Sequence, residues 1–163
     1  MNASKHHFMS LIKGGSMEIE RKFIVDQIPS DLDIFKNSYI EQGYLSIIPE
    51  VRIRMLNDKC FLTVKSSGTL SRDEYETEIS LNTYNDFKKK LIGESLIKQR
   101  HYINIGEYVA ELDIYENLKN LKVVEVEFMT VDQAIRFKIP NWFGKEVTYD
   151  ESFKNKNLFK IIS

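Results

Sequence analysis

The sequence predicts an α+β fold that is mainly β: an eight-stranded, antiparallel closed barrel with a few flanking helices. From residue 17 onward, apolar and polar residues alternate with a period of two, which is typical of strands. Turn-forming pairs separate the alternating runs, as at Asn57-Asp58 and Gly106-Glu107, and tight turns place antiparallel strands side by side. Eight strands joined by short links favour a barrel.

Each predicted element follows from one such run or from a short helical pattern. The strands are expected at residues 17–25, 39–47, 51–57, 59–66, 73–81, 96–105, 107–115 and 121–129. Asn82 or Thr83 is expected to cap a helix that ends near Gly93, and Asp132 a short helix that Pro140 stops. A short helix at 28–36 and a helical or irregular segment at 150–162 complete the prediction.

Residues 1–16 differ from the rest of the chain. They are largely polar and end in Lys13-Gly14-Gly15-Ser16, which is typical of a flexible joint. The apolar piece at residues 8–12 is too weak for a secretory signal, whose apolar region has about 7–15 residues. We therefore expect a flexible leader over residues 1–16 and one domain over residues 17–163, with Met17 as the functional start.

Charge and cysteine content exclude several classes of protein. The 23 basic and 24 acidic side chains give a net charge of −1, which provides no broad attraction to nucleic acid or to an anionic membrane. No apolar run approaches the roughly 20 residues of a membrane-spanning helix. The single cysteine, Cys60, excludes an intrachain disulfide and is consistent with a cytoplasmic location. Outside the leader only His101 remains, so a histidine-based metal site or triad is not expected.

Charged residues occupy alternate positions on nearly every predicted strand, and their signs are sorted. The basic members are Lys22, Arg52, Arg54, Lys65, Lys98 and Arg100. The acidic members are Glu18, Glu20, Glu76, Glu78, Glu111, Asp113, Glu125 and Glu127. A solvated sheet face explains any single pair. Like-charged pairs that recur from strand to strand instead indicate a ligand, because like charges held close together repel one another.

A triphosphate with divalent cations would balance both sets of charges. Arg and Lys side chains bind phosphate oxygens, and hard cations such as Mg²⁺ prefer carboxylate oxygens. The charged faces would then line a hydrated interior, while the apolar faces would point outward and need helices to cover them. Periodicity alone does not decide which face is inside.

Glu18-Ile19-Glu20-Arg21-Lys22 resembles the Glu-x-Glu-x-Lys signature of the CYTH superfamily of triphosphate tunnel metalloenzymes. The resemblance continues in the family's order through Gln42–Leu45, Val51–Arg54, Thr63–Lys65, Glu76–Glu78, Ile97–Arg100, Glu111–Asp113, Val124–Glu127 and Lys145–Thr148. It spans essentially the whole domain. It implies a tunnel-like eight-stranded barrel that binds a triphosphate through its basic residues.

The resemblance also implies roles for the charged residues. Phosphate binding is expected of Lys22, Arg52, Arg54, Lys65, Lys98, Arg100 and, at one mouth of the barrel, Lys145. Metal binding is expected of Glu18, Glu20, Glu125 and Glu127, with two divalent cations, Mg²⁺ or Mn²⁺, in the site. A second metal, its waters or the basic residues would be held by Glu76, Glu78, Glu111 and Asp113. Catalysis would depend most on Lys22, Glu18, Glu20 and Glu127. Tyr44 would either hydrogen-bond a basic residue such as Lys98 or serve as a packing residue.

The activity implied is metal-dependent hydrolysis of inorganic triphosphate to pyrophosphate and phosphate. An adenylate cyclase of class IV type or a nucleoside triphosphatase would use the same groups. A thiamine triphosphatase would also need a site for thiamine, for instance around Trp142 or Tyr149. A non-catalytic polyphosphate sensor is a further alternative, although a pure anion binder has no need for so many carboxylates. The expected partner is a small molecule that contains a triphosphate, and such barrels often form homodimers.

Overall fold

The computed structural model describes residues 19–32, 35–65, 74–119 and 121–162. Eight strands form one antiparallel sheet with the order β1-β8-β7-β6-β2-β3-β4-β5. The strands are β1 (Ile19–Ile24), β2 (Asn37–Ser46), β3 (Glu50–Leu56), β4 (Lys59–Lys65), β5 (Glu74–Ile79), β6 (Leu96–Ile105), β7 (Tyr108–Tyr115) and β8 (Lys122–Phe128). The predicted mainly β, antiparallel architecture is confirmed: β6 has the predicted bounds, and the ends of the other strands lie within two residues of the predicted ones.

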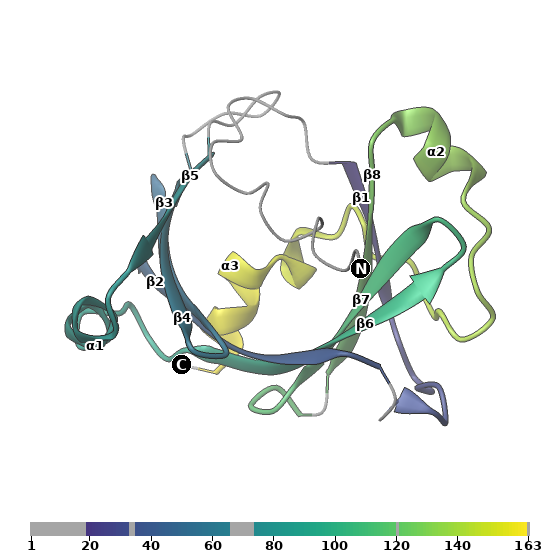
Figure 1. The fold of residues 1–163 in the computed structure, drawn as a ribbon. Helices are drawn as coiled ribbons and strands as arrows, with labels where there is room; N and C mark the ends of the chain where they lie inside the picture. Colours follow the sequence, from purple (N-terminus) through teal and green to yellow (C-terminus); the bar gives the residue numbers. More distant parts are fainter. Residues whose placement is uncertain (1–18, 33–34, 66–73, 120, 163) are drawn as a thin grey trace, which may run out of the picture.

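The sheet is strongly curved, and β1 and β5 lie at its two edges (Figure 1). Within the described residues, these two strands do not pair with each other. The structure therefore shows a trough rather than the closed barrel that the strand pattern predicts. The curvature gives the sheet a concave face and a convex face, and alternate residues of each strand point to one or the other.

Helix α1 (Leu81–Lys88) covers the convex face of one half of the sheet. The oxygen of Ser80 caps it by accepting a hydrogen bond from the Thr83 nitrogen at 3.1 Å, so the cap lies two or three residues before the predicted one. Beneath the helix, Ile53, Cys60 and Tyr84 form a buried apolar cluster. The predicted burial of Cys60 is confirmed.

Helix α2 (Val131–Arg136) covers the other half of the convex face, against β1 and β8. Thr130 and Gln133 form a capping box at its start. The backbone nitrogen of Gln133 donates to the Thr130 hydroxyl, and the backbone nitrogen of Thr130 donates to the Gln133 side chain. The expected cap, Asp132, instead lies in the first turn. A larger apolar cluster lies on this half of the sheet, with Phe128 and Phe137 packed edge to face at 5.3 Å.

The C-terminal segment, residues 151–161, consists of the 3-10 helix η2 (Glu151–Phe153), α3 (Asn155–Leu158) and the 3-10 helix η3 (Phe159–Ile161). Figure 1 shows α3 on the concave side of the sheet. The described part of residues 28–36 contains no α-helix, contrary to the prediction, and the predicted leader lies outside the described residues. None of the helices described is both long and apolar enough to cross a membrane.

Candidate active site

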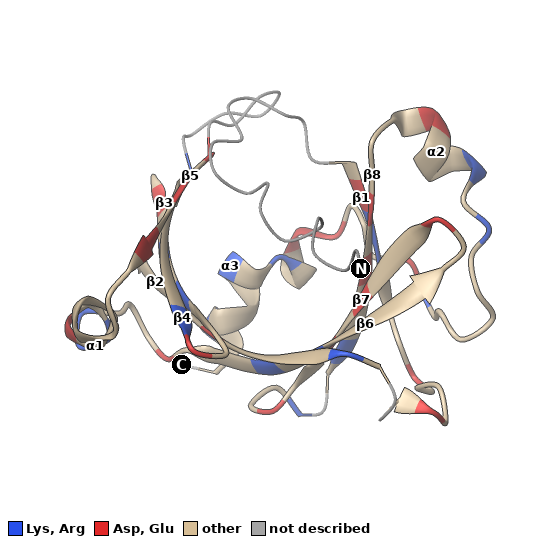
Figure 2. Cartoon of the chain, in the orientation of Figure 1, with Lys and Arg blue, Asp and Glu red and all other residues tan. Residues whose placement is uncertain are grey.

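The concave face encloses a polar cavity of about 370 Å³. Basic and acidic residues recur along the strands that form it (Figure 2). The cavity is lined by Glu20, Lys22, Ile40, Gln42, Tyr44, Glu50, Arg52, Arg54, Lys65, Glu74, Glu76, Lys98, Arg100, Glu111, Glu125, Glu127, Lys154, Asn155 and Lys156. The charged alternate faces therefore point inward, and the two large apolar clusters lie under α1 and α2 on the outside.

Strand register explains why these side chains meet. Residues two apart on a strand share a face, and directly opposite residues on neighbouring strands share it too. Glu20 lies opposite Glu127, while both Lys22 and Glu111 lie opposite Glu125. The structure thus gathers most of the predicted site residues in one cavity, although the strands that carry them are widely separated in sequence.

Three of the predicted residues that the structure describes do not line this cavity, namely Glu78, Asp113 and Lys145. Glu18 lies outside the described residues and stays a prediction. Lys145 has an exposed side chain in a loop, where its carbonyl accepts a hydrogen bond from the Ile24 nitrogen at 2.9 Å. Glu78 is exposed near the end of β5, with a carboxylate oxygen 3.6 Å from the Lys59 ammonium. The metal-site roles expected of Glu18 and Glu78, and the role expected of Lys145 at one mouth, stay predictions.

A buried network of charges occupies the wall formed by β6 and β7. Asp113 accepts a hydrogen bond from the Lys98 ammonium and two from the Arg100 guanidinium, at 2.6 and 2.8 Å. Burial opposes ionisation of Asp113, but Arg100 and Lys98 outweigh this effect and lower the pKa of its carboxyl to about 2. Burial lowers the pKa of Lys98, and Asp113 partly offsets that change. Asp113 lies directly behind the basic residues and holds them in place.

A second ion pair joins β1 to β8. The Lys22 ammonium lies 2.6 Å from a carboxylate oxygen of Glu125, and it also donates a hydrogen bond to the carbonyl of Phe153 at 3.2 Å. Burial raises the pKa of Glu125, but Lys22 is the main cause of a net lowering. Lys22, the lysine of the family signature, is therefore held by contacts with both β8 and the C-terminal segment.

The opposite wall, formed by β3, β4 and β5, carries Arg52, Arg54 and Lys65, each within ion-pair distance of a carboxylate of the same wall. Arg54 donates hydrogen bonds to both oxygens of Glu76 at 3.1 Å, and Lys65 lies 3.1 Å from Glu74. Burial lowers the pKa of Arg54, and the nearby positive charge of Arg52 adds to that effect. The buried Nε atoms of Arg52 and Arg54 have no hydrogen-bond partner in the structure. Because buried donors are normally satisfied, these atoms are suited to bind an anion.

Acidic side chains on β1, β7 and β8 form the part of the cavity best suited to a metal ion. They are Glu20, Glu111, Glu125 and Glu127, which supply the hard oxygen donors that Mg²⁺ and Mn²⁺ prefer. Burial raises the pKa of Glu111, and repulsion from Asp113, Glu125 and Glu127 raises it further. A divalent cation would relieve this repulsion, so the donor set fits the group, although no preformed metal cluster occurs among the described residues.

Tyr44 lines the cavity, and its hydroxyl contacts Gln42 and the basic residue Arg52 rather than Lys98. It accepts a hydrogen bond from Gln42 Nε2 at 2.9 Å, while the ammonium of Lys98 is bonded to Asp113. The ring stacks on Phe159 with centroids 5.0 Å apart. Burial is the main cause that raises the pKa of Tyr44 above its usual value. The phenol therefore stays neutral in this arrangement and combines packing with a polar contact.

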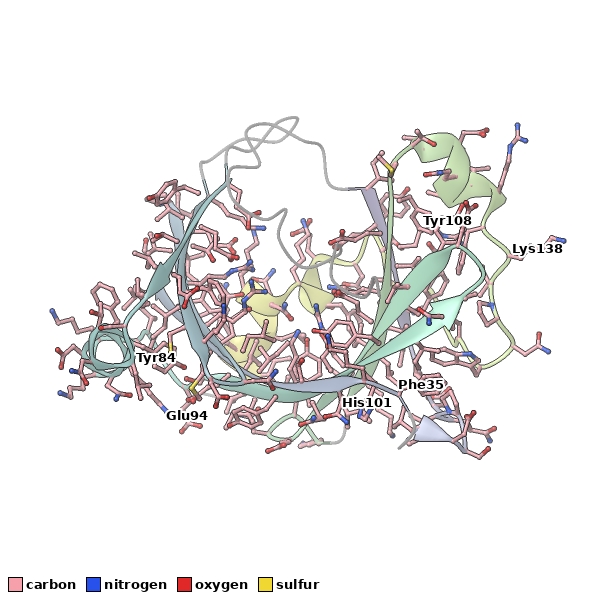
Figure 3. All side chains as sticks on the ribbon, viewed as in Figure 1. Phe35, Tyr84, Glu94, His101, Tyr108 and Lys138 are labelled. Atoms are coloured by element: carbon pink, nitrogen blue, oxygen red, sulfur yellow. The ribbon has the colours of Figure 1, made fainter. Side chains whose placement is uncertain are left out.

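His101 lies on the convex side, as Figure 3 shows, and is 7% exposed. It follows Arg100 in the strand and therefore points to the opposite face. Trp142 packs against Phe143 with ring centroids 4.5 Å apart, and Tyr149 is 94% exposed. Neither lines the cavity, so the residues considered for a thiamine site are not part of it.

Several cavity residues were missed by the sequence analysis. Glu50 and Glu74 each lie two residues before a predicted site residue, so extending the alternation by one step would have found them. Lys154, Asn155 and Lys156 come from the C-terminal segment, where no strand pattern exists to indicate which residues face the cavity.

Comparison with known proteins gives consistent matches over most of the chain. The CYTH domain model matches residues 16–146. A relative named inorganic triphosphatase, from Nitrosomonas europaea, is 38% identical over 146 residues, covering 86% of this chain and 95% of the relative. A second relative of the same name, from Acetivibrio thermocellus, is 37% identical over 149 residues, covering 88% of this chain and 93% of its own.

A solved structure agrees with these matches. The crystal structure described as the inorganic triphosphatase NE1496 is 34% identical to this chain and superposes with a TM-score of 0.72, covering 91% of this chain and 96% of that one. The likeness therefore covers most of both chains. The sequence motifs, the cavity and these matches agree that the chain belongs to the CYTH domain family.

Proposed function

We propose that this protein hydrolyses inorganic triphosphate to pyrophosphate and phosphate in the cavity of the concave face, with divalent cations. The observation that carries the proposal is that one cavity gathers both basic groups and carboxylates, with one group of carboxylates on β1, β7 and β8 and basic residues on β1, β3, β4 and β6. A linear triphosphate with bound cations has the complementary distribution of charge. The relatives named inorganic triphosphatase support the choice of substrate.

The basic side chains bind and orient the phosphates in this mechanism. They are Lys22, Arg52, Arg54, Lys65, Lys98 and Arg100. The Nε atoms of Arg52 and Arg54 have no hydrogen-bond partner, so they can donate to a phosphate oxygen without first losing another hydrogen bond. Phosphoryl transfer depends more on positioning and charge stabilisation than on a protein nucleophile, which agrees with a cavity lined by neither His nor Cys among the described residues.

The carboxylates of Glu20, Glu111, Glu125 and Glu127 would hold Mg²⁺ or Mn²⁺, and Glu18 is predicted to join them. Bound cations would neutralise charge on the phosphates and lower the pKa of a water that attacks a terminal phosphorus. Glu125 now contacts Lys22, so binding of the substrate exchanges this contact for one between Lys22 and a phosphate oxygen. The remaining carboxylates, Glu76 and Asp113, keep Arg54 and Arg100 oriented.

Closure of the sheet into a tunnel belongs to the same proposal. Residues of both edge strands, Lys22 on β1 and Glu76 on β5, line the same cavity, so a bound ligand would contact both edges.

We also place the protein in a reducing compartment such as the cytoplasm, because its single cysteine is buried and unpaired. Assembly as a homodimer stays a prediction that light scattering can test.

Phosphate release from tripolyphosphate, ATP and thiamine triphosphate, each with Mg²⁺ or Mn²⁺, tests the proposal. Tripolyphosphate is expected to be the best substrate by kcat/KM, and Lys22→Ala is expected to remove the activity. Lys138→Ala is the matched control, because Lys138 is exposed on the outer side of the molecule (Figure 3). Formation of cyclic AMP from ATP would replace the hydrolase proposal with a cyclase, and tight binding without turnover would favour a sensor.

A further inference from the structure

The C-terminal segment forms part of the cavity wall, although none of its residues belongs to the strand motifs that predict the site. Lys154, Asn155 and Lys156 line the cavity together with the strand residues. Figure 2 shows basic residues at α3 and in the segment next to it, on the concave side of the sheet. The segment thus adds two positive charges to a site whose other bases come from the sheet.

Specific contacts fix the position of this segment. The hydroxyl of Tyr115 donates a hydrogen bond to Asn155 Oδ1 at 2.6 Å, and Lys22 donates one to the Phe153 carbonyl at 3.2 Å. Just beyond, Leu158 and Phe159 are 2% and 3% exposed. These contacts flank the two lysines on both sides along the chain, so the lysines are presented to the cavity by an anchored backbone.

The two lysines differ from the strand bases in their partners. Lys22 and Lys65 are each close to a carboxylate that lines the cavity. Lys154 contacts Glu151 at 2.5 Å, but that carboxylate is 67% exposed, and solvent screens such a pair. No described carboxylate lies within ion-pair distance of Lys156, which is half-buried. An ammonium that faces a polar cavity in this way is suited to bind an oxyanion.

We propose that Lys156, assisted by Lys154, binds a terminal phosphate of the substrate and helps the site to distinguish triphosphate from pyrophosphate. The inference rests on the proposed function. A triphosphate is long enough to contact the strand bases and the C-terminal segment together. Pyrophosphate has one phosphate fewer, so it loses part of one set of contacts. The segment therefore favours the substrate over a product that shares its chemistry.

Calorimetric titration with tripolyphosphate and with pyrophosphate, at fixed ionic strength with and without Mg²⁺, tests this inference. Lys156→Ala is expected to weaken tripolyphosphate binding about tenfold or more, which is the effect of losing a charge-assisted hydrogen bond. Pyrophosphate binding is expected to change less than about threefold by the same reasoning. Lys156→Arg should retain most of the affinity. Lys160→Ala is the control, because Lys160 is exposed on the same segment and does not line the cavity.

The outcomes separate the two proposals. If the unaltered protein fails to bind tripolyphosphate, the proposed function itself is wrong. If it binds tripolyphosphate and Lys156→Ala binds equally well while remaining folded by circular dichroism, the inference is overturned. Equal weakening of tripolyphosphate and pyrophosphate would overturn the discrimination between them. In steady-state assays, a rise in KM that exceeds the fall in kcat for Lys156→Ala would support a binding role.

Discussion

Asp113→Asn is expected to lower the free energy of unfolding, because it leaves the buried positive charges of Lys98 and Arg100 without their carboxylate partner. Asp113 is 1% exposed and holds both Lys98 and Arg100. Loss of one partner from a buried ion pair costs about 3–5 kcal/mol. The pKa of about 2, against an ordinary value of 3.8, independently corresponds to about 2 kcal/mol of stabilisation of the ionised carboxylate. A loss of about 3 kcal/mol at pH 7 is consistent with both figures.

The pH dependence gives this prediction a second readout. Because the pKa of Asp113 is lower in the folded protein than in the unfolded chain, its stabilising contribution is present above pH 3.8 and is lost as pH falls towards about 2. The difference in unfolding free energy between the unaltered protein and Asp113→Asn should therefore shrink between pH 5 and pH 2. Urea denaturation followed by circular dichroism at several pH values measures this difference.

A matched control is available on the surface. Asp86 also has a lowered pKa, caused first by its hydrogen bond with Lys89 at 2.9 Å, but it is fully exposed to solvent. Asp86→Asn should therefore leave the unfolding free energy almost unchanged, because solvent screens such a pair. Equal stability of Asp113→Asn and the unaltered protein at pH 7 would refute the reasoning. A difference that stays constant down to pH 2 would refute its electrostatic part.

Four further perturbations test other parts of the structure. Lys22→Ala should lower kcat on tripolyphosphate by about 10²–10³-fold, and rates like those of the unaltered protein would contradict its role. EDTA should abolish phosphate release, and Mg²⁺ or Mn²⁺ should restore it; turnover without added cation would contradict metal dependence. Phe159→Ala should lower the unfolding free energy in urea by about 3–5 kcal/mol, because Phe159 is buried against Tyr44. Thr130→Ala should cost about 1 kcal/mol through loss of the α2 cap, and an unchanged urea midpoint would contradict that.

The strands and the inward-facing charges could be predicted because they depend on a local rule. A period of two places residues such as Arg52 and Arg54 on one face whatever the rest of the chain does. The family resemblance then supplied the choice of the concave face. Helix caps were less well predicted, because Ser80 and Thr130 compete with nearby Asn82 and Asp132, which are equally good caps in isolation.

The pairing of individual charges could not be predicted, because it depends on strand order. Lys98 was considered as one possible partner of Tyr44, but the register of β6 with β7 places Asp113 within reach of Lys98 and Arg100. The C-terminal segment was equally inaccessible. Its short helical turns have no alternation that would assign Lys156 to the cavity, and only tertiary packing of Phe159 brings it there.

The pairing of β1 with β8 has a consequence for biosynthesis. Glu20 lies opposite Glu127 across these two strands, and Arg21, also on β1, pairs through two hydrogen bonds with Glu146, which lies beyond β8 and 125 positions further along the chain. Such long-range pairing slows folding, because a large loop must close before the contacts form. On the ribosome, β1 emerges first yet has no partner until nearly the whole domain has been synthesised. The acidic wall that would hold the cations is thus completed only after the strands that carry the phosphate-binding arginines, so a chain truncated before β8 would carry those arginines without it.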